Sequence, residues 1–399
     1  MIDKQRIAEL STEILQEVID SRRHLHRFPE LSFQEVQTSA FIAGKLREWG
    51  IPFQENIGGY GVVGMIEGEH GAGPTIALRG DMDALPIQEE NDVEYASVHD
   101  GVMHACGHDV HSSSLLGTAF VLSRMKANFA GRVKLVFQPG EEKLPGGASL
   151  MIKDGVLRNP EPAVIVGQHV HPPLEAGMVG FCPGKYMASS DELFLTVRGQ
   201  GGHGALPHQG IDTTLAAAHI IVALQQIVSR RSDPTIPSVL TLGKIESDGG
   251  STNIIPDTVH IQGTFRAMDE QWRSQAHDLI RQTVENTARA LGAEASIEIK
   301  VGYPYLYNEP RLTQRLQTRA IEFLGPDRVV DLPIQMTSED FAFYSHEIDA
   351  CFYRLGISSP GATAPRQLHT STFDVDERCF ETSIGLMAYL ALAELAENQ

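Results

Sequence analysis

The chain has 399 residues, and its 51 acidic against 32 basic side chains give a formal net charge of −19. This charge repels nucleic acid and anionic membranes, so we expect neither as a partner. A hydrophobic share of 42% without repeats or low-complexity tracts is typical of a globular protein, and the length favours a large domain with a smaller one.

The first 18 residues mix charged side chains with apolar ones at helical spacing, at Ile7, Leu10, Ile14 and Val18. They predict an amphipathic helix and lack the apolar core of a signal peptide. The apolar stretch TTLAAAHIIVAL is too short to span a membrane. Four cysteines without framework spacing suit a reducing compartment, so we expect a cytoplasmic protein.

The next elements alternate between helices and strands. Pro29 breaks the chain, and SFQE predicts a capping-box start at Ser32 for a helix that ends near Gly50. Short apolar strands are predicted at 61–67, 75–81, 132–138 and 163–169, with helices at 110–126 and 147–154. This alternation predicts an α/β fold: a mostly parallel sheet covered by helices, with ligands beyond the carboxyl ends of the strands.

Beyond about residue 186 the pattern changes. Strand, helix, strand, strand, helix and strand are predicted at 192–198, 211–230, 238–246, 258–266, 270–291 and 295–301. This order is a ferredoxin-like βαββαβ module. The remaining residues return to helix and strand, in RLTQRLQTRAIEF and ACFYRLG. We therefore expect a catalytic domain formed by residues 1–185 and 305–399, with an inserted ferredoxin-like lid domain at 186–304.

Three of the early strands lead directly into ionisable groups: Asp81 and Asp83, Glu141 and Glu142, and His169 and His171. Parallel strands end at one edge of a sheet, so we expect these groups to meet. Neighbouring carboxylates suggest that one binds a metal and the other acts as a base on water. The two aspartates either bind metal or accept the hydrogen bond that fixes a histidine tautomer.

The segment GVMHACGHDVH, residues 101–111, is dense in cysteine, histidine and aspartate. Two interpretations are open at this point. Cys106 and His108 bind a metal ion, or Cys106 is a nucleophile with His108 or His169 as its base. Mixed sulfur, nitrogen and oxygen ligands would accept zinc, manganese, cobalt or nickel.

Further candidate residues lie in the inserted module. GQGGHGALPH carries His203 in a glycine-rich turn, where the backbone can approach a ligand. STNIIPD and GTFRAMD contain Asn253 and Arg266, an amide donor and a fork-shaped cation suited to a carboxylate. By contrast, GYGVVG at 59–64 fits a dinucleotide fingerprint only in its letters, because a strand rather than a helix is predicted to follow it.

The combination of DMDALP, MHACGHDVH, FQPGEE, GGHGALPH, TNIIPD, SEDFAFY and LHTSTFDVDE resembles the amidohydrolase family that includes aminoacylases, hippurate hydrolase and the plant auxin-conjugate hydrolases. The resemblance covers nearly the whole chain. It implies metal-dependent hydrolysis of the amide bond of N-acyl amino acids, and two divalent ions, zinc or manganese, with cobalt or nickel as alternatives. It also implies a homodimer, or a dimer of dimers, formed through the lid domain. Gly80 and Gly140 stand where many relatives are expected to have alanine.

The resemblance also implies roles for single residues. The implied metal ligands are Cys106, His108, Glu142, His169 and His369. Glu141 is the implied general base, and Asp83 supports a metal-binding group. His203 is implied to reach the reacting carbonyl, in its own subunit or in the partner's, while Asn253 and Arg266 hold the substrate carboxylate. The alternatives are a dipeptidase or carboxypeptidase of the same dimetal type, and a cysteine hydrolase that uses Cys106.

Overall fold

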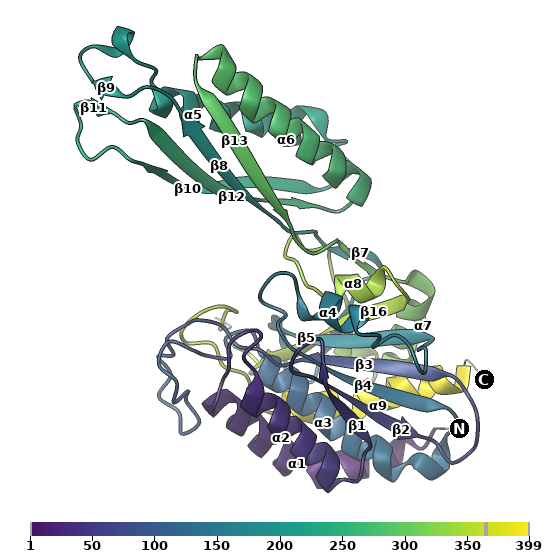
Figure 1. The fold of residues 1–399 in the computed structure, drawn as a ribbon. Helices are drawn as coiled ribbons and strands as arrows, with labels where there is room; N and C mark the ends of the chain where they lie inside the picture. The colour runs from purple at the N-terminus through teal and green to yellow at the C-terminus, as the bar shows by residue number, and fades with distance from the viewer. Residues whose placement is uncertain (1, 363–365, 398–399) are drawn as a thin grey trace. The chain divides into compact units, whose positions relative to one another are not determined.

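The computed structural model describes residues 2–362 and 366–397. The chain forms two compact units, coloured by residue number in Figure 1. Residues 1–184, 307–333 and 340–399 form the first unit, and residues 185–306 and 334–339 form the second. The predicted roles of the two parts, catalysis and lid, stay predictions.

The first unit contains an eight-stranded sheet. Its strands, in spatial order, are β1 (Phe53–Ile57), β2 (Gly61–Glu67), β4 (Arg132–Gln138), β3 (Thr75–Asp81), β5 (Val164–Glu175), β16 (Asp349–Ser358), β6 (Val179–Phe181) and β15 (Val329–Asp331). The four central strands β4, β3, β5 and β16 run parallel, whereas β1, β2 and β6 pair antiparallel with their neighbours on the central side. Every residue of β3 is buried, as expected for a central parallel strand covered on both faces.

The helices of this unit are α1 (Lys4–Arg27), α2 (Val36–Glu48), α3 (His108–Arg124), α4 (Gly147–Lys153), α7 (Pro310–Leu324), α8 (Ala342–Ser345) and α9 (Cys379–Glu397). Helices α3 and α9 pack against the central strand β3, and α1 packs across both. Figure 1 shows α4 and α8 on the opposite side of the sheet from α1, α2 and α3. The predicted α/β fold, a sheet with a parallel centre covered by helices, is confirmed.

Helix α9 was not singled out in the sequence. It is long and apolar enough to cross a membrane by length and composition alone, but 89% of its most apolar stretch is buried inside the protein. Its residues belong to the main hydrophobic core of the first unit. This is the behaviour of a core helix, and α9 anchors the chain that follows His369.

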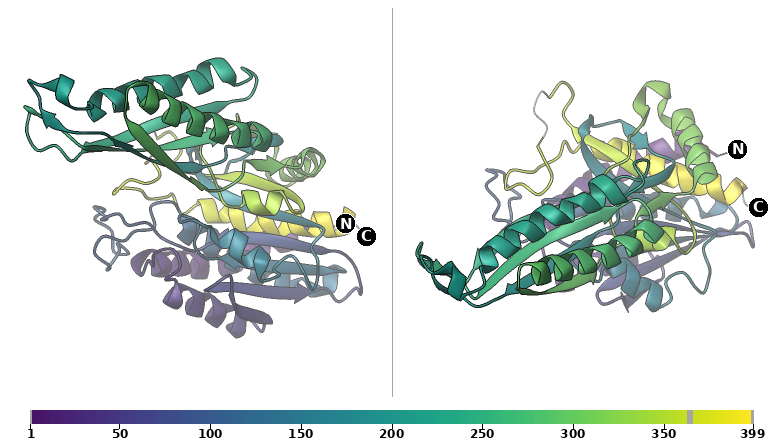
Figure 2. Two further views of the ribbon diagram at one scale, coloured as in Figure 1. Left: turned by 45° about the horizontal axis from the view of Figure 1, so that its top comes forward. Right: turned by 90° about the horizontal axis from the view of Figure 1, so that it is seen from above.

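The second unit has its own hydrophobic core under a four-stranded antiparallel sheet. The strands, in spatial order, are β10 (Ser238–Ser247), β12 (Thr258–Ala267), β8 (Asp191–Arg198) and β13 (Glu294–Val301). Helices α5 (Thr213–Gln226) and α6 (Glu270–Ala290) lie side by side on one face of it (Figure 2). The predicted ferredoxin-like βαββαβ module is confirmed. Two short strand pairs complete the fold, β9 (Gly202–His203) with β11 (Ile254–Ile255), and β7 (Gly184–Met187) with β14 (Leu306–Asn308).

The predicted capping box at Ser32 is wrong. Helix α2 begins at Val36, and the Glu30 carboxylate caps it by accepting the N–H groups of Gln37 and Thr38, each at 2.9 Å. The Ser32 hydroxyl instead donates to Asp83, at 2.6 Å. Ser32 therefore contacts a residue that is distant in the sequence instead of capping the helix. This contact links the residues before α2 to the candidate site.

Candidate metal centre and active site

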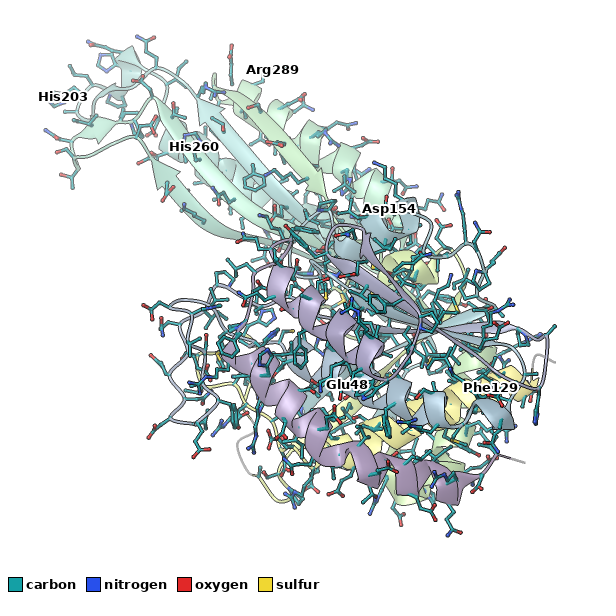
Figure 3. All side chains as sticks on the ribbon, turned by 60° about the horizontal axis from the view of Figure 1, so that its bottom comes forward. Glu48, Phe129, Asp154, His203, His260 and Arg289 are labelled. Atoms are coloured by element: carbon teal, nitrogen blue, oxygen red, sulfur yellow. The ribbon has the colours of Figure 1, made fainter. Side chains whose placement is uncertain are left out.

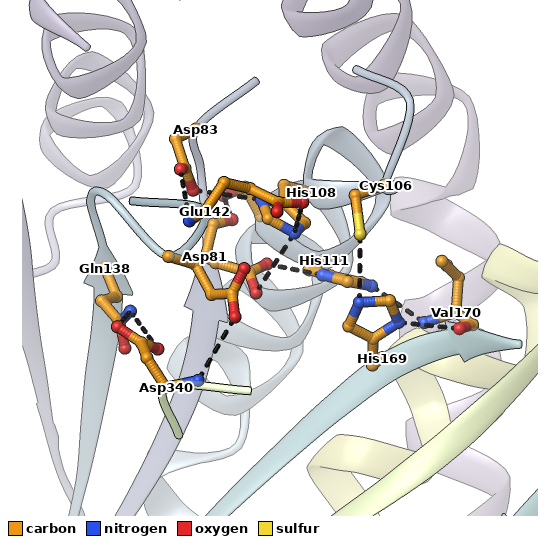
Figure 4. A network of polar contacts seen from close by, with 12 residues as sticks. Asp81, Asp83, Cys106, His108, His111, Gln138, Glu142, His169, Val170 and Asp340 are labelled. Carbon is orange, nitrogen blue, oxygen red and sulfur yellow. Dashed lines mark hydrogen bonds and ion pairs between the residues drawn. The ribbon is translucent and has the colours of Figure 1, made fainter. Parts of the chain in front are cut away.

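The candidate site of the first unit lies at the carboxyl ends of the parallel strands (Figure 4). Its side chains are Asp81 at the end of β3, Cys106 and His108 at the start of α3, Glu141 and Glu142 after β4, His169 in β5, and His369 in the segment before α9. Gly107 has φ 81, and a Cβ there would lie 2.6 Å from a methyl group of Val170. Only glycine allows this sharp turn, which lets Cys106 and His108 serve the same site.

The structure brings all five predicted ligands together. Five sets of side chains in the described part of the chain have potential ligand atoms within 4.8 Å of one another, and three of them contain predicted ligands from different segments: Cys106, His108 and His169; Cys106, Glu142 and His369; and His108, Glu141 and Glu142. The first two sets share the Cys106 sulfur. These two sets are candidate sites for two adjacent cations, formed by segments that are far apart in the sequence.

Asp83 orients two of these ligands. Its Oδ1 lies 3.1 Å from Nδ1 of His108, and its Oδ2 accepts the N–H of Glu142 at 3.0 Å. Nε2 of His108 is therefore left facing the other ligands, 3.9 Å from Oε1 of Glu142. Neither of these two buried atoms has a hydrogen-bond partner within the described part of the chain.

His169 is held in the tautomer that a metal needs. Its Nδ1 donates to the carbonyl of Val170 at 2.7 Å, and its Nε2 lies 3.4 Å from the Cys106 sulfur. Burial lowers the pKa of His169 well below the usual value, so the ring is neutral with a lone pair on Nε2. His111 is different, because it donates to Asp81 at 2.5 Å and accepts the N–H of Val170 at 2.9 Å. Both nitrogens of His111 are thus used in holding β3 and β5 together.

The charges at the site favour bound cations. Burial raises the pKa of the Cys106 thiol, and Glu142, Glu141 and Asp81 raise it further. Burial alone would lower the pKa of His108, but mainly Asp81 and Asp83 raise it to about 10. Clustered carboxylates beside histidine nitrogens and a thiol are a ligand set that fits divalent ions.

A buried polar network orients the carboxylates of Asp81 and Glu141. Arg79 donates to Asp81 at 2.6 Å and to Asp340 at 2.9 Å, and the backbone N–H of Asp340 donates to Oε1 of Glu141 at 3.2 Å. Sequence reasoning quoted SEDFAFY, which contains Asp340, but gave it no role, and it passed over Arg79. The available signal was an arginine inside a mostly apolar strand, two residues before Asp81.

Three further predicted residues belong to the second unit. Exposed His203, labelled in Figure 3, pairs with Ile254 across β9 and β11, and the next residue, Gly204, donates its N–H to the carbonyl of Asn253 at 2.7 Å. His203 and Asn253 are therefore neighbours. Arg266, on β12, donates to Ser338 at 2.8 Å. The roles predicted for these three residues stay predictions.

Two adjacent cation positions, with a carboxylate pair beside them at the carboxyl edge of a parallel sheet, define a metal-dependent hydrolase. Comparison with known families agrees, because residues 77–393 match the model of peptidase family M20/M25/M40. The chain belongs to this family and is one of its amidohydrolases.

Several relatives resemble the chain over most of its length. An N-acetyl-L-cysteine deacetylase of Bacillus subtilis is 40% identical and covers 90% of this chain and 84% of its own. An N-acyl-L-amino acid amidohydrolase of Geobacillus stearothermophilus is 41% identical, over 76% of this chain and 81% of its own. Among solved structures, a dinuclear metal-binding peptidase of the M20 family from Bacillus subtilis is 33% identical, with a TM-score of 0.82 over 97% of this chain and 100% of that one.

Proposed function

We propose that this enzyme hydrolyses the amide bond of N-acyl amino acids, releasing a carboxylic acid and a free amino acid. The observation that carries the proposal is the pair Glu141 and Glu142 beside the two ligand sets that share Cys106. The names of the relatives from Bacillus subtilis and Geobacillus stearothermophilus point to substrates of this class.

The proposed cofactors are two divalent cations, zinc or manganese, with cobalt and nickel as alternatives. Their proposed ligands are Cys106, His108, Glu142, His169 and His369. When bound, such ions polarise a carbonyl oxygen and lower the pKa of water. The tautomer of His169 leaves the lone pair of its Nε2 available for this purpose. The contact of His108 Nδ1 with Asp83 directs its Nε2 toward the other ligands, where a bound cation would replace the proton.

Glu141 is the proposed general base. The Asp340 N–H holds one of its oxygens. The carboxylate takes a proton from the attacking water and delivers it to the departing nitrogen of the amide, so that the amino acid leaves as an amine. Removing the base should lower turnover and leave metal binding intact.

Residues of the second unit are proposed to complete the substrate site. Nδ1 of His203 accepts the N–H of Ala205 at 3.0 Å, so the ring proton is on Nε2, which can donate to a carbonyl oxygen. Asn253 and Arg266 are the proposed partners of the substrate carboxylate.

A homodimer through the lid domain is also proposed. Strand β10 lies at the edge of the four-stranded sheet, and α5 presents exposed Leu215 and Val222 on one face. An open strand edge beside an apolar helix face is the kind of surface that a second copy covers. The four buried free cysteines support a reducing, cytoplasmic location.

The second candidate function is a carboxypeptidase of the same dimetal type. A relative named thermostable carboxypeptidase 2, from Saccharolobus solfataricus, is 36% identical over 97% of both chains. The two functions differ in the acyl group of the cleaved amide bond. In the amidohydrolase it comes from a simple carboxylic acid, and in the carboxypeptidase it comes from an amino acid or a peptide.

One assay separates these functions. The metal-stripped protein is reconstituted with zinc, manganese, cobalt or nickel in turn, and each form is given N-acetyl, N-benzoyl and indole-acetyl amino acids beside matched dipeptides. We expect release of free amino acid from the acyl substrates only after a metal is added. Preferential cleavage of the dipeptides would favour the carboxypeptidase, and full activity of the stripped protein would contradict both.

A further inference from the structure

Arg22 in helix α1 is a buried cation that the proposed chemistry does not use. Its side chain has no exposed surface. Nε donates to Oδ2 of Asp109 at 2.8 Å, and Nη2 donates to Oδ1 of Asp374 at 2.8 Å. The ring of Tyr95 lies 4.7 Å from the guanidinium carbon. Nη1 adds a longer contact, 3.4 Å from Oε1 of Glu377. One guanidinium therefore bridges Asp109 and, in a distant part of the chain, Asp374 and Glu377.

The carboxylates of Asp109 and Asp374 belong to segments that carry proposed metal ligands. Asp109 directly follows His108 at the start of α3, and Asp374 follows His369 in the segment before α9. The Arg22 bridge thus connects the segment that carries Cys106 and His108 with the segment that carries His369.

The two ligand-bearing segments differ in their local secondary structure. His108 lies in a helix and has Asp83 as a hydrogen-bond partner. Residues 366–378 form no helix or strand. His369 itself has φ 60, a backbone conformation that residues other than glycine rarely adopt. Contacts from outside must hold this segment in place.

Several contacts tie the His369 segment to its surroundings, among them hydrogen bonds from Glu90 to Ser371 and from Tyr95 to Asp374. The N–H of His369 donates to the carbonyl of Ala105 at 2.8 Å, and the Asn91 side chain donates to the carbonyl of Phe373 at 2.9 Å. Arg22 adds a charged, two-pronged contact made by a side chain. We therefore expect the position of His369 to depend on it.

Packing alone does not explain an arginine here. Burial would lower the pKa of Arg22, but Asp109 and Asp374 raise it above the usual value, so the side chain stays charged. Apolar side chains of similar volume often replace a whole buried ion pair, all partners together, at no cost to stability. What an apolar residue cannot supply is a fixed distance between two carboxylates, and the compact ammonium of lysine lacks the fork that spans them.

We propose that Arg22 is a positioning residue, which sets the spacing of the two ligand-bearing segments and so the affinity for the cation held by Cys106, Glu142 and His369. The inference rests on the ligand set proposed above. It predicts that loss of the bridge affects one of the two cations and leaves the other unaffected.

Cobalt binding tests this proposal without any substrate. Metal-stripped wild type, Arg22→Lys and Asp374→Asn are titrated with Co²⁺, and binding is followed by the visible bands and by the thiolate-to-cobalt absorption of Cys106. His369→Ala identifies which of the two ions this ligand holds. Arg315→Lys is the matched control, because Arg315 pairs with the buried carboxylate of Glu394 between α7 and α9.

The expected result is selective. In Arg22→Lys and Asp374→Asn, the affinity for the ion lost in His369→Ala falls roughly 10- to 100-fold, the usual effect of removing a residue that orients a ligand. The affinity for the other ion stays at the value of the Arg315→Lys control.

Three results would overturn the proposal. Both variants could bind two cobalt ions as tightly as the control, or both ions could weaken equally together with the thermal midpoint, which is a purely structural effect. A wild type that binds fewer than two ions would contradict the proposed ligand set, and this inference with it. If Arg22→Lys does not fold, Asp374→Asn decides alone, because it removes the shorter contact to the His369 segment and leaves the buried arginine paired with Asp109 and, at 3.4 Å, with Glu377.

Discussion

At the scale of single residues, Asp83 shows how one buried carboxylate can orient two ligands. It contacts His108 through one oxygen, and Ser32 and the Glu142 backbone through the other. Burial would raise the pKa of Asp83, but these partners lower it below its usual value, so the group stays ionised. Asp83 thus orients the imidazole ring of His108 and the turn that contains Glu142.

Replacing Asp83 should therefore weaken metal binding. In Asp83→Asn the amide cannot accept all three hydrogen bonds, and we expect metal affinity to fall roughly 10- to 100-fold. Competition with a chromophoric chelator measures this. Asp154→Asn is the control, because Asp154 (Figure 3) accepts the N–H of Gly58 in another part of the unit. Equal affinities in the two variants would show that Asp83 does not orient the ligands.

Glu141→Gln tests the general base. The amide keeps the size of the side chain but cannot take a proton, so kcat should fall roughly 100- to 10,000-fold. Metal content, measured by mass spectrometry of the elements, should match the wild type because Glu141 is not a proposed ligand. A fully loaded variant with near-normal turnover would refute the assignment.

Glu35 predicts a dependence of stability on pH. Burial and the charge of Asp83 raise its pKa from 4.5 to about 7. Between these values the unfolded chain loses the proton while the folded protein keeps it, so stability falls as the pH rises, by up to roughly 3 kcal/mol. Below the lower value Glu35 is protonated in both the folded and the unfolded protein, so it does not make the free energy of unfolding depend on pH.

Glu35→Gln cannot ionise, so its advantage over wild type should grow from acidic to neutral pH. Urea unfolding of the metal-free proteins, at about pH 5 and about pH 8, measures it. Exposed Glu55→Gln provides the baseline. A stability difference between Glu35→Gln and wild type that does not change with pH would contradict the raised pKa.

At the scale of elements, the turn after β4 decides where the two carboxylates point. Gly140 has φ 59, and a Cβ there would lie 2.3 Å from the Phe33 ring. The N–H of Gly140 donates to the Glu35 carboxylate at 2.7 Å. The alanine expected in many relatives thus does not fit this turn unless Phe33 moves.

Gly140→Ala should destabilise the protein and displace Glu141. The left-handed conformation alone costs about 1–2 kcal/mol for a residue with a Cβ. We expect a lower thermal midpoint and a lower kcat, both partly restored by adding Phe33→Ala, which removes the ring. A single variant with wild-type stability and turnover would show that the turn tolerates a side chain.

Sequence reasoning succeeded for elements whose signal is local. The strands predicted at 61–67, 75–81 and 132–138 agree with β2, β3 and β4 because each is a continuous apolar run between turn residues. It failed at the start of α2, where Ser32 bonds to Asp83 instead of capping the helix. Very short strands such as β6 and β15 carry too few residues for a periodic signal.

The same distinction applies to the candidate site. Cysteine, histidine and paired glutamates at strand ends are rare enough to be noticed in a sequence, and these residues do meet. Arg22, Arg79 and Asp340 are ordinary residue types in ordinary segments. Their importance comes from contacts between segments that are distant in the sequence, and only the folded structure reveals those.

At the scale of the whole molecule, the site depends on both ends of the chain. The first unit is built from residues on either side of the second, and His369 reaches the site only because α9 and the segment before it return to the sheet. A net charge of −19 also makes bound cations favourable overall. The central claim is therefore that distant segments form one pocket for two metal ions.

Anomalous diffraction from crystals grown with zinc tests this claim most directly. The account predicts two peaks in each subunit, one among Cys106, His108 and His169 and the other among Cys106, Glu142 and His369. A site without zinc, or zinc bound by other residues while these five keep their metal-free contacts, would contradict it.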